Sequence, residues 1–209
     1  MGERLGVFGG TFDPIHYGHL IAAAELRHAL GVDRVLFVPA PRPPHKKSNV
    51  VGTDSQRLAM VELAIAGEPG FEVSRVEFDR SGPSYTVNTL ADLAMAHPGA
   101  DLLLFLGEDA LRDLPTWREP QRILRLAHLA VATRPRSALD LQALLRALPE
   151  ATGRFTLVPT PSIGISATDL RSRVQQDRPV RFQTPDTVIG YIREHALYRS
   201  GPESATCGC

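Results

Sequence analysis

GGTFDPIHYGH, at residues 9–19, follows a short apolar strand and opens a helix rich in alanine and leucine. The two adjacent glycines, Gly9 and Gly10, let the backbone come close to a ligand, and the free amides at a helix N-terminus form an anion site. His16 and His19 are three residues apart, so both imidazoles can lie on one side of the first turn and donate hydrogen bonds to phosphate oxygens. The stretch predicts a phosphate site at a strand–turn–helix corner. The alternative is an ordinary corner with two incidental histidines.

Outward from this corner, short apolar runs alternate with helical patterns along the chain. The unbroken apolar run at 102–106 is typical of a central parallel strand that is buried on both faces. The alternation predicts a single α/β domain over residues 1–199, with a parallel sheet covered by helices on both faces. Ligands of such sheets bind beyond the carboxyl ends of the strands. We expect strands at 5–8, 35–38, 71–73, 76–78, 102–106, 129–132 and 155–158, and helices at 18–30, 53–66, 86–97, 139–148, 168–175 and 186–197.

Composition limits the class of protein. The 209 residues carry a formal net charge of zero, so no global positive field favours nucleic acid or an anionic membrane as partner. No apolar run approaches the ~18 residues of a membrane span, and no signal-peptide pattern is present, which predicts a cytoplasmic protein. Cys207 and Cys209 are the only cysteines; they exclude a disulfide framework and make a poor metal site. Residues 200–209 are predicted to be a disordered tail, and the oligomeric state is not predicted.

A second motif, ISATDLR at residues 165–171, has its own physical logic. Ser166 and Thr168 can cap a helix whose first amides bind an oxyanion. Arg171 lies one turn further on and can reach a phosphate as a permanent cation. Taken alone, this string is an ordinary capped helix.

The two motifs together resemble a known family. Residues 10–19 look like the signature of the H-x-G-H nucleotidyltransferases, and residues 165–171 are similar to that family's I-S-x-T-x-[IL]-R motif. The resemblance implies a Rossmann-like fold in which the two histidines bind ATP phosphates. The chain lacks the G-x-G-x-x-G and G-K-[ST] patterns of dinucleotide and Walker sites. The ATP-binding residues that the resemblance implies are Gly9, Gly10, Thr11, Phe12, His16, His19, Gly107, Asp109, Ile165, Ser166, Thr168 and Arg171.

Two elements in the middle of the chain narrow the resemblance. Pro44-His45-Lys46 and Ser84-Tyr85-Thr86 resemble the P-H-K and S-Y-T elements of nicotinic acid mononucleotide adenylyltransferases. Lys46 offers charge to a phosphate, and the amides at Tyr85 and Thr86 could bind the nicotinate carboxylate at a helix N-terminus. The alternatives are a solvated Lys46 and a routine helix cap at Thr86.

Residues 106–117 are also similar to that subfamily. Asp109 lies just past a buried strand and could hydrogen-bond ribose hydroxyls. Trp117, the only tryptophan, could stack on a pyridine ring, unless it is a core residue. Glu108 and Ala167 depart from the family's pattern and leave the ATP contacts at those two positions open.

The resemblance implies transfer of the adenylyl group of ATP to nicotinic acid mononucleotide, which gives deamido-NAD and pyrophosphate. Mg²⁺ on the phosphates is expected, although no dedicated carboxylate cage is found for it. The alternatives are another acceptor, nicotinamide mononucleotide or phosphopantetheine, or a non-catalytic module that binds adenine nucleotides. The implied catalytic residues are His16, His19, Lys46 and Arg171; the implied substrate-binding residues are His45, Lys46, Tyr85, Thr86, Trp117 and Arg134.

Overall fold

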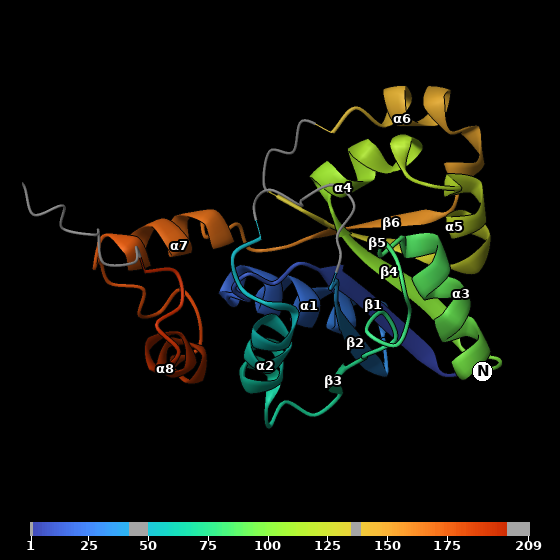
Figure 1. The fold of residues 1–209 in the computed structure, drawn as a ribbon. Coiled ribbons are helices and arrows are strands. Elements are labelled where there is room, and N and C mark those ends of the chain that lie inside the picture. Colours follow the sequence, from blue (N-terminus) through green and yellow to red (C-terminus); the bar gives the residue numbers. More distant parts are fainter. Residues whose placement is uncertain (1, 42–49, 135–138, 200–209) are drawn as a thin grey trace, which may run out of the picture.

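The computed structural model describes residues 2–41, 50–134 and 139–199. Six parallel strands form one sheet in the order β3-β2-β1-β4-β5-β6, which confirms the predicted Rossmann-like sheet (Figure 1). The chain builds outward from β1 to β3 and then returns to the other side of β1, so the switch point lies between β1 and β4. The strands are β1 (Arg4–Gly10), β2 (Arg34–Pro39), β3 (Phe71–Val73), β4 (Asp101–Gly107), β5 (His128–Thr133) and β6 (Phe155–Pro159).

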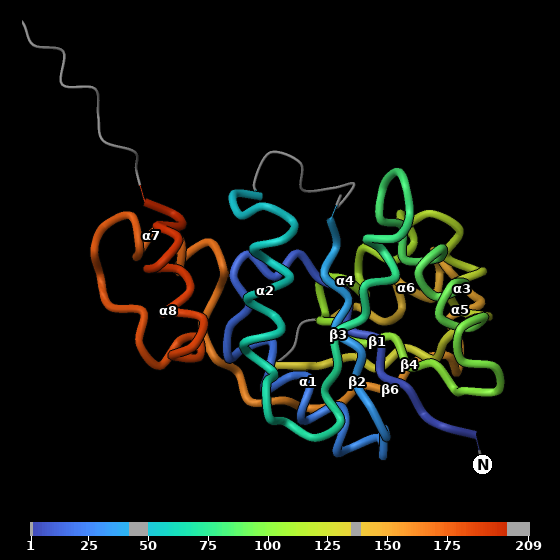
Figure 2. Tube along the Cα trace, turned by 60° about the horizontal axis from the view of Figure 1, so that its bottom comes forward, coloured from blue at the N-terminus to red at the C-terminus, as the bar shows by residue number. Residues whose placement is uncertain are grey.

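Helices cover both faces of the sheet, as expected. Helices α1, α2 and α8 pack on one face, and α3, α5 and α6 pack on the other. Figure 2 shows the α7–α8 pair at one side of the molecule, beside α2 and away from α3 and α5. The helices are α1 (Tyr17–Leu30), α2 (Asp54–Ile65), α3 (Thr86–Ala96), α4 (Glu108–Asp113), η1 (Leu114–Thr116), α5 (Pro120–Leu126), α6 (Leu141–Ala147), η2 (Pro149–Ala151), α7 (Ala167–Gln175) and α8 (Asp186–Glu194). No helix among these described residues is long and apolar enough to cross a membrane; the cytoplasmic location stays a prediction.

The central strand β4 explains why its sequence is apolar without interruption. Side chains of a strand alternate between the two faces of a sheet. Leu102 and Leu104 belong to the core on the α3 side, whereas Leu103 and Phe105 belong to the core on the α1 side. All four are at most 4% exposed. Burial of each such side chain contributes about 1.5–3 kcal/mol, so both layers of helices are held through this strand.

One local prediction was wrong, and two short helices were missed. Residues 76–78 form a turn and not a strand, with the amide of Phe78 donating to the carbonyl of Arg75 at 2.8 Å. The carboxyl group of Glu77 is buried and accepts a hydrogen bond from Thr89 of α3. In a strand at the sheet edge it would face solvent. Helices α4 and α5 were not predicted, because each is shorter than the window over which a helical period can be read.

A buried carboxylate fixes the strand–turn–helix corner to the end of the described chain. Asp13 is 2% exposed, and its Oδ1 accepts a 2.7 Å hydrogen bond from the hydroxyl of Tyr198. Burial and the neighbouring carboxylate raise the pKa of Tyr198, so the phenol stays protonated and remains a donor. The bond joins segments 185 residues apart.

Tyr198→Phe should therefore lower the free energy of unfolding by about 1–3 kcal/mol, because a buried carboxylate loses a donor without gaining water. Urea denaturation followed by circular dichroism measures this difference. Tyr191→Phe is the matched control, since the Tyr191 hydroxyl makes no hydrogen bond within the described part of the chain and its ring packs at 4.2 Å from His195. Equal effects of the two substitutions would contradict a specific role for the Asp13–Tyr198 bond.

Candidate active site

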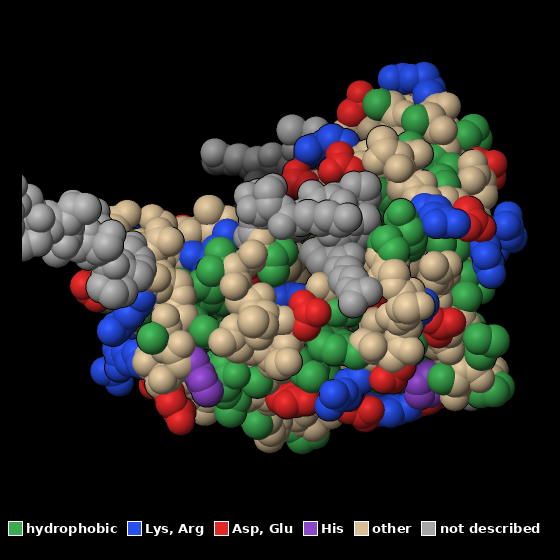
Figure 3. Space-filling view, viewed as in Figure 1, with side chains coloured by type: hydrophobic (Ala, Val, Ile, Leu, Met, Phe, Trp, Pro, Cys, Tyr) green, Lys and Arg blue, Asp and Glu red, His purple; other side chains and the backbone are tan. Residues whose placement is uncertain are grey.

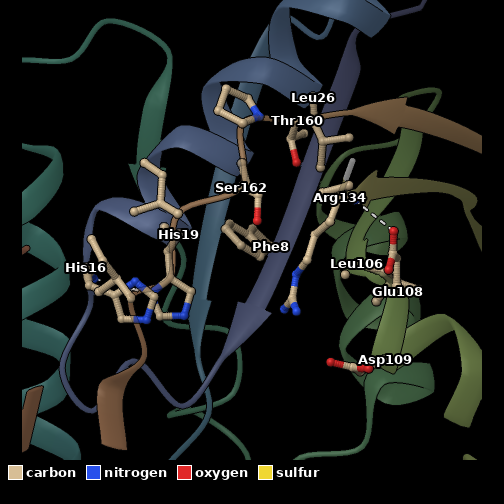
Figure 4. Close-up of a pocket in the computed structure, with 17 residues that line it drawn as sticks. Phe8, His16, His19, Leu26, Leu106, Glu108, Asp109, Arg134, Thr160 and Ser162 are labelled. Carbon is tan, nitrogen blue, oxygen red and sulfur yellow. Dashed lines mark hydrogen bonds between the residues drawn. The ribbon is translucent and has the colours of Figure 1, made fainter. Parts of the chain in front are cut away.

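Two pockets open at the carboxyl edge of the sheet, beside the switch point between β1 and β4. The first is a cavity of about 290 Å³ and the second one of about 570 Å³. Asp109 lines both, so the two cavities share a wall. The first is lined by Phe8, His16, Gly18, His19, Ala22, Leu26, Leu106, Gly107, Glu108, Asp109, Ala132, Arg134, Thr160, Pro161, Ser162, Ile163 and Ile165 (Figure 4), and the second by Ser84, Tyr85, Thr86, Asp109, Ala110, Asp113, Thr116, Trp117, Arg118 and Ile123.

The two predicted histidines lie side by side in the first pocket (Figure 4). Their rings stack with centroids 3.7 Å apart and planes 21° apart, and the amide of His16 donates to Nδ1 of His19 at 3.3 Å. His16 is the N-cap of α1. A Cβ atom on Gly18 would lie 3.0 Å from Nδ1 of His16, so the glycine of H-x-G-H leaves room for the ring of the first histidine.

His16 is held as a neutral imidazole. It is 7% exposed, and burial lowers its pKa to about 4. Its Nδ1 atom is buried and has no hydrogen-bond partner among the described residues. A buried polar atom without a partner costs free energy until something binds it, so this end of the pocket is suited to a polar ligand.

The glycines of the corner differ in what surrounds them. A Cβ on Gly9 would meet nothing within 4 Å, whereas one on Gly10 would lie 2.8 Å from the ring of Phe12. Phe12 is 2% exposed and has a positive φ of 48°. Four ligand contacts were predicted here, at residues 9–12. Gly9 offers open backbone to a ligand. The ring of Phe12 and the carbonyl of Thr11 are engaged within the protein, the first in the core and the second by Arg57.

The second motif reaches the first pocket through Ile165, just ahead of α7. Ser166 caps α7 as predicted, with Oγ accepting from the amide of Asp169 at 3.1 Å. Arg171 reaches back to the corner: it donates to the carbonyl of Asp13 at 2.6 Å and to Thr168 Oγ1 at 3.4 Å. The structure thus brings the two motifs together, with Arg171 engaged by the loop that carries the histidines.

The opposite wall comes from the ends of β4 and β5. Gly107 precedes α4, and a Cβ there would meet nothing within 4 Å. The carboxylate of Glu108 accepts from the amide of Arg134 at 2.8 Å, so this departure from the family pattern ties the two strand ends together. Figure 4 shows the Arg134 guanidinium extending into the space between the histidines and Asp109. Thr160 and Ser162 complete this pocket and carried no recognisable sequence signal.

The second pocket lies against the N-terminus of α3. Tyr85 is the N-cap and Thr86 the first helical residue, so the first amides of the helix point toward this cavity's side of the molecule. Trp117 is half-buried: it packs against the core and also lines the pocket, so its stacking on a pyridine ring stays a prediction. Arg118 lines the pocket as well and was missed from the sequence.

Two predicted residues, His45 and Lys46, lie outside the described residues.

Acidic and basic side chains are interspersed along the lower edge of the face in Figure 3, so charge is not gathered there into a region of one sign. Among the residues that the structure describes, no three His, Cys, Asp or Glu side chains gather in a way that could hold a metal ion.

The His16 imidazole should titrate near pH 4 in the ligand-free protein, which side-chain NMR measures, with His16→Asn assigning the signal. Its pKa is lower in the folded chain than the ordinary value of 6.5, so the unfolded chain binds the proton more tightly. The stability that neutral His16 contributes is therefore complete above pH 6.5 and is lost as the pH falls toward 4. A phosphate-containing ligand should move the midpoint upward. A midpoint near 6.5 without ligand would contradict the burial argument.

Comparison with known proteins agrees with this geometry. Residues 7–173 match the family model described as cytidylyltransferase-like. A structure of Plasmodium falciparum nicotinic acid mononucleotide adenylyltransferase complexed with NaAD has the same fold, with a TM-score of 0.74 at 19% identity over 94% of this chain and 97% of that one.

Closer relatives are found by sequence. The chain is 50% identical over 198 residues to a Thermomicrobium roseum protein, covering 95% of this chain and 92% of that one. It is 52% identical over 195 residues to a Roseiflexus protein, covering 93% and 98%. Both relatives carry the name "Probable nicotinate-nucleotide adenylyltransferase". At this identity and coverage, the chain belongs to the nicotinate-nucleotide adenylyltransferases of the cytidylyltransferase-like family.

Proposed function

We propose that this chain transfers the adenylyl group of ATP to nicotinic acid mononucleotide, forming deamido-NAD and pyrophosphate in NAD biosynthesis. One observation carries the proposal: two pockets share Asp109 as a wall at the switch point of the sheet. One holds the stacked histidines, and the other holds Trp117 and the N-terminus of α3. Joining two nucleotides requires two adjacent sites whose phosphate ends meet, and two pockets with a shared wall support this proposal.

The first pocket is assigned to ATP and the second to the mononucleotide. The histidine pair, the open backbone of Gly9 and the reach of Arg134 suit a triphosphate and its ribose. The indole of Trp117 suits a pyridine ring, and the amides of α3 suit its carboxylate. The names of the relatives and the NaAD bound to the Plasmodium enzyme support this assignment.

The reaction needs positioning and charge stabilisation more than proton transfer. A phosphate oxygen of the mononucleotide attacks the α-phosphorus of ATP, the bond from that phosphorus to the bridging oxygen of pyrophosphate breaks, and pyrophosphate leaves. The nucleophile is already an anion, so no strong base is required. His16, His19, Lys46 and Arg171 are proposed to donate to the phosphate oxygens as negative charge shifts toward the leaving group.

Mg²⁺ is proposed to arrive with ATP, coordinated by phosphate oxygens and water. Asp109 is the only carboxylate that lines both pockets among the described residues, and it already pairs with Arg112 at 3.0 Å. The chain's own contribution is then to orient the phosphates around the ion.

Pyrophosphate release from ATP and Mg²⁺ tests the proposal, with nicotinic acid mononucleotide beside nicotinamide mononucleotide and phosphopantetheine. We expect strong release with the first acceptor. His19→Ala should lower kcat with it roughly 10²-fold, the cost of losing one donor to developing charge. His28→Ala, at the exposed far end of the same helix, is the control and should leave kcat unchanged. Release with another acceptor alone would overturn the pocket assignment, and ATP binding without any release would favour a binding module.

Trp117→Ala should raise KM for the mononucleotide about tenfold or more and change KM for ATP much less, since base–aromatic stacking contributes roughly 1–3 kcal/mol. Steady-state kinetics with each substrate varied in turn measures both constants. Trp117→Phe keeps an aromatic face and should recover most of the loss. A parallel rise in both KM values would argue that Trp117 only supports the core.

A further inference from the structure

Among the described residues, the predicted ones that line the mononucleotide pocket include no cation that could attract the carboxylate of the proposed substrate. The pocket's charged lining residues, among those described, are Asp109, Asp113 and Arg118. Two carboxylates beside a cavity repel an anion, and the proposed substrate carries a carboxylate on its pyridine ring. Arg112 offsets the charge of Asp109 at 3.0 Å, but both of those side chains are mostly exposed. Arg118 is therefore the cation of this wall.

Arg118 is held where an anion at the start of α3 would meet it. Its guanidinium carbon lies 4.8 Å from the centroid of the Tyr85 ring, a cation–π contact. Tyr85 is the N-cap of α3. The stack therefore keeps the guanidinium beside the same helix end whose first amides face the pocket, and two sources of positive potential converge there.

The guanidinium keeps donors available for a ligand. Among the described residues its nearest carboxylate is that of Glu119, at a long 3.7 Å, with both side chains about half exposed. Glu119 is shared with Arg122, which it contacts at the shorter distance of 3.3 Å. A guanidinium has five N–H donors in a planar fork that matches a carboxylate, and one long contact leaves most of them unused.

We propose that Arg118 is a specificity-determining residue that binds the pyridine carboxylate of the mononucleotide and so favours the acid over its amide. The proposal rests on the function proposed above. Helix amides can donate to the oxygen of a carboxylate or of a carboxamide alike, so they discriminate weakly by themselves. A permanent cation discriminates, because only the carboxylate carries the opposite charge and accepts two parallel hydrogen bonds.

Binding can be measured without turnover, because Trp117 is the single tryptophan of the chain and lines this pocket. Quenching of its fluorescence gives Kd for nicotinic acid mononucleotide and for nicotinamide mononucleotide. Wild type, Arg118→Ala and Arg118→Lys are compared, with Arg122→Ala as the matched control. Arg122 carries the same charge and contacts the same Glu119, but it does not line the pocket.

Arg118→Ala should weaken binding of the acid about tenfold or more, the usual size of a charge-assisted hydrogen bond, and change binding of the amide less than twofold. Arg118→Lys should keep part of the preference, since lysine supplies a point charge without the planar fork. The preference of the wild type should fall as salt is added, while that of Arg118→Ala should not. Arg122→Ala should leave both Kd values unchanged.

An equal loss for both mononucleotides in Arg118→Ala would overturn the proposal, because it would mean that Arg118 only supports Tyr85 and the wall. An unchanged ratio of the two Kd values, or the same shift in Arg122→Ala, would overturn it as well. Failure of the proposed function is a separate result: the wild type would then release no pyrophosphate with nicotinic acid mononucleotide, whatever the variants do.

Discussion

The buried carboxylate of Asp13 joins the segments from which the active site is built. Its oxygens accept from the amides of Val51 and Gly52 at 2.7 and 3.0 Å and from the Tyr198 hydroxyl at 2.7 Å, and Arg171 lies 3.9 Å away. Burying a charge costs several kcal/mol unless donors replace the lost water. Three donors and a cation meet that requirement only when the loop before α1, the start of α2, α7 and the segment that carries Tyr198 are all in place.

Arg57 is a buried cation that holds the same segments together. It is fully buried, and it donates to the carbonyls of Thr11 and Ala40 at 2.8 Å each and pairs with Asp54 at 2.7 Å. Ala40 precedes residues 42–49, and Gly52, which Asp13 holds, follows them. Both flanks of the segment that carries His45 and Lys46 are thus fixed to the loop that carries the histidine pair.

What could be predicted from the sequence was what short-range patterns encode. Apolar runs identified the strands, and the spacing of His16 and His19 placed both rings on one turn. Charged residues are almost never fully buried unless paired, so nothing marked Arg57 as an exception, and its partners lie up to 46 residues away. Asp13 stood inside the predicted loop, yet its role depends on Tyr198. Residues 76–78 resemble a strand in sequence because an acidic residue stands between two apolar ones. That pattern predicts that Glu77 faces solvent, whereas its carboxyl group is buried.

The sheet topology explains how a chain of zero formal charge can attract two anionic substrates. In a parallel α/β sheet each helix that follows a strand begins at the carboxyl edge, so α1, α3 and α7 all start there, after β1, β3 and β6. Each start carries partial positive charge from unpaired amides. That attraction is generic to the fold and does not distinguish one phosphate compound from another. The proposed discrimination comes from side chains at this edge: the histidine pair on α1, Tyr85 with Arg118 and Trp117 near the start of α3, and Ser166 with Arg171 on α7. The choice of acceptor is therefore expected to depend on a few side chains at the carboxyl edge and not on the sheet itself.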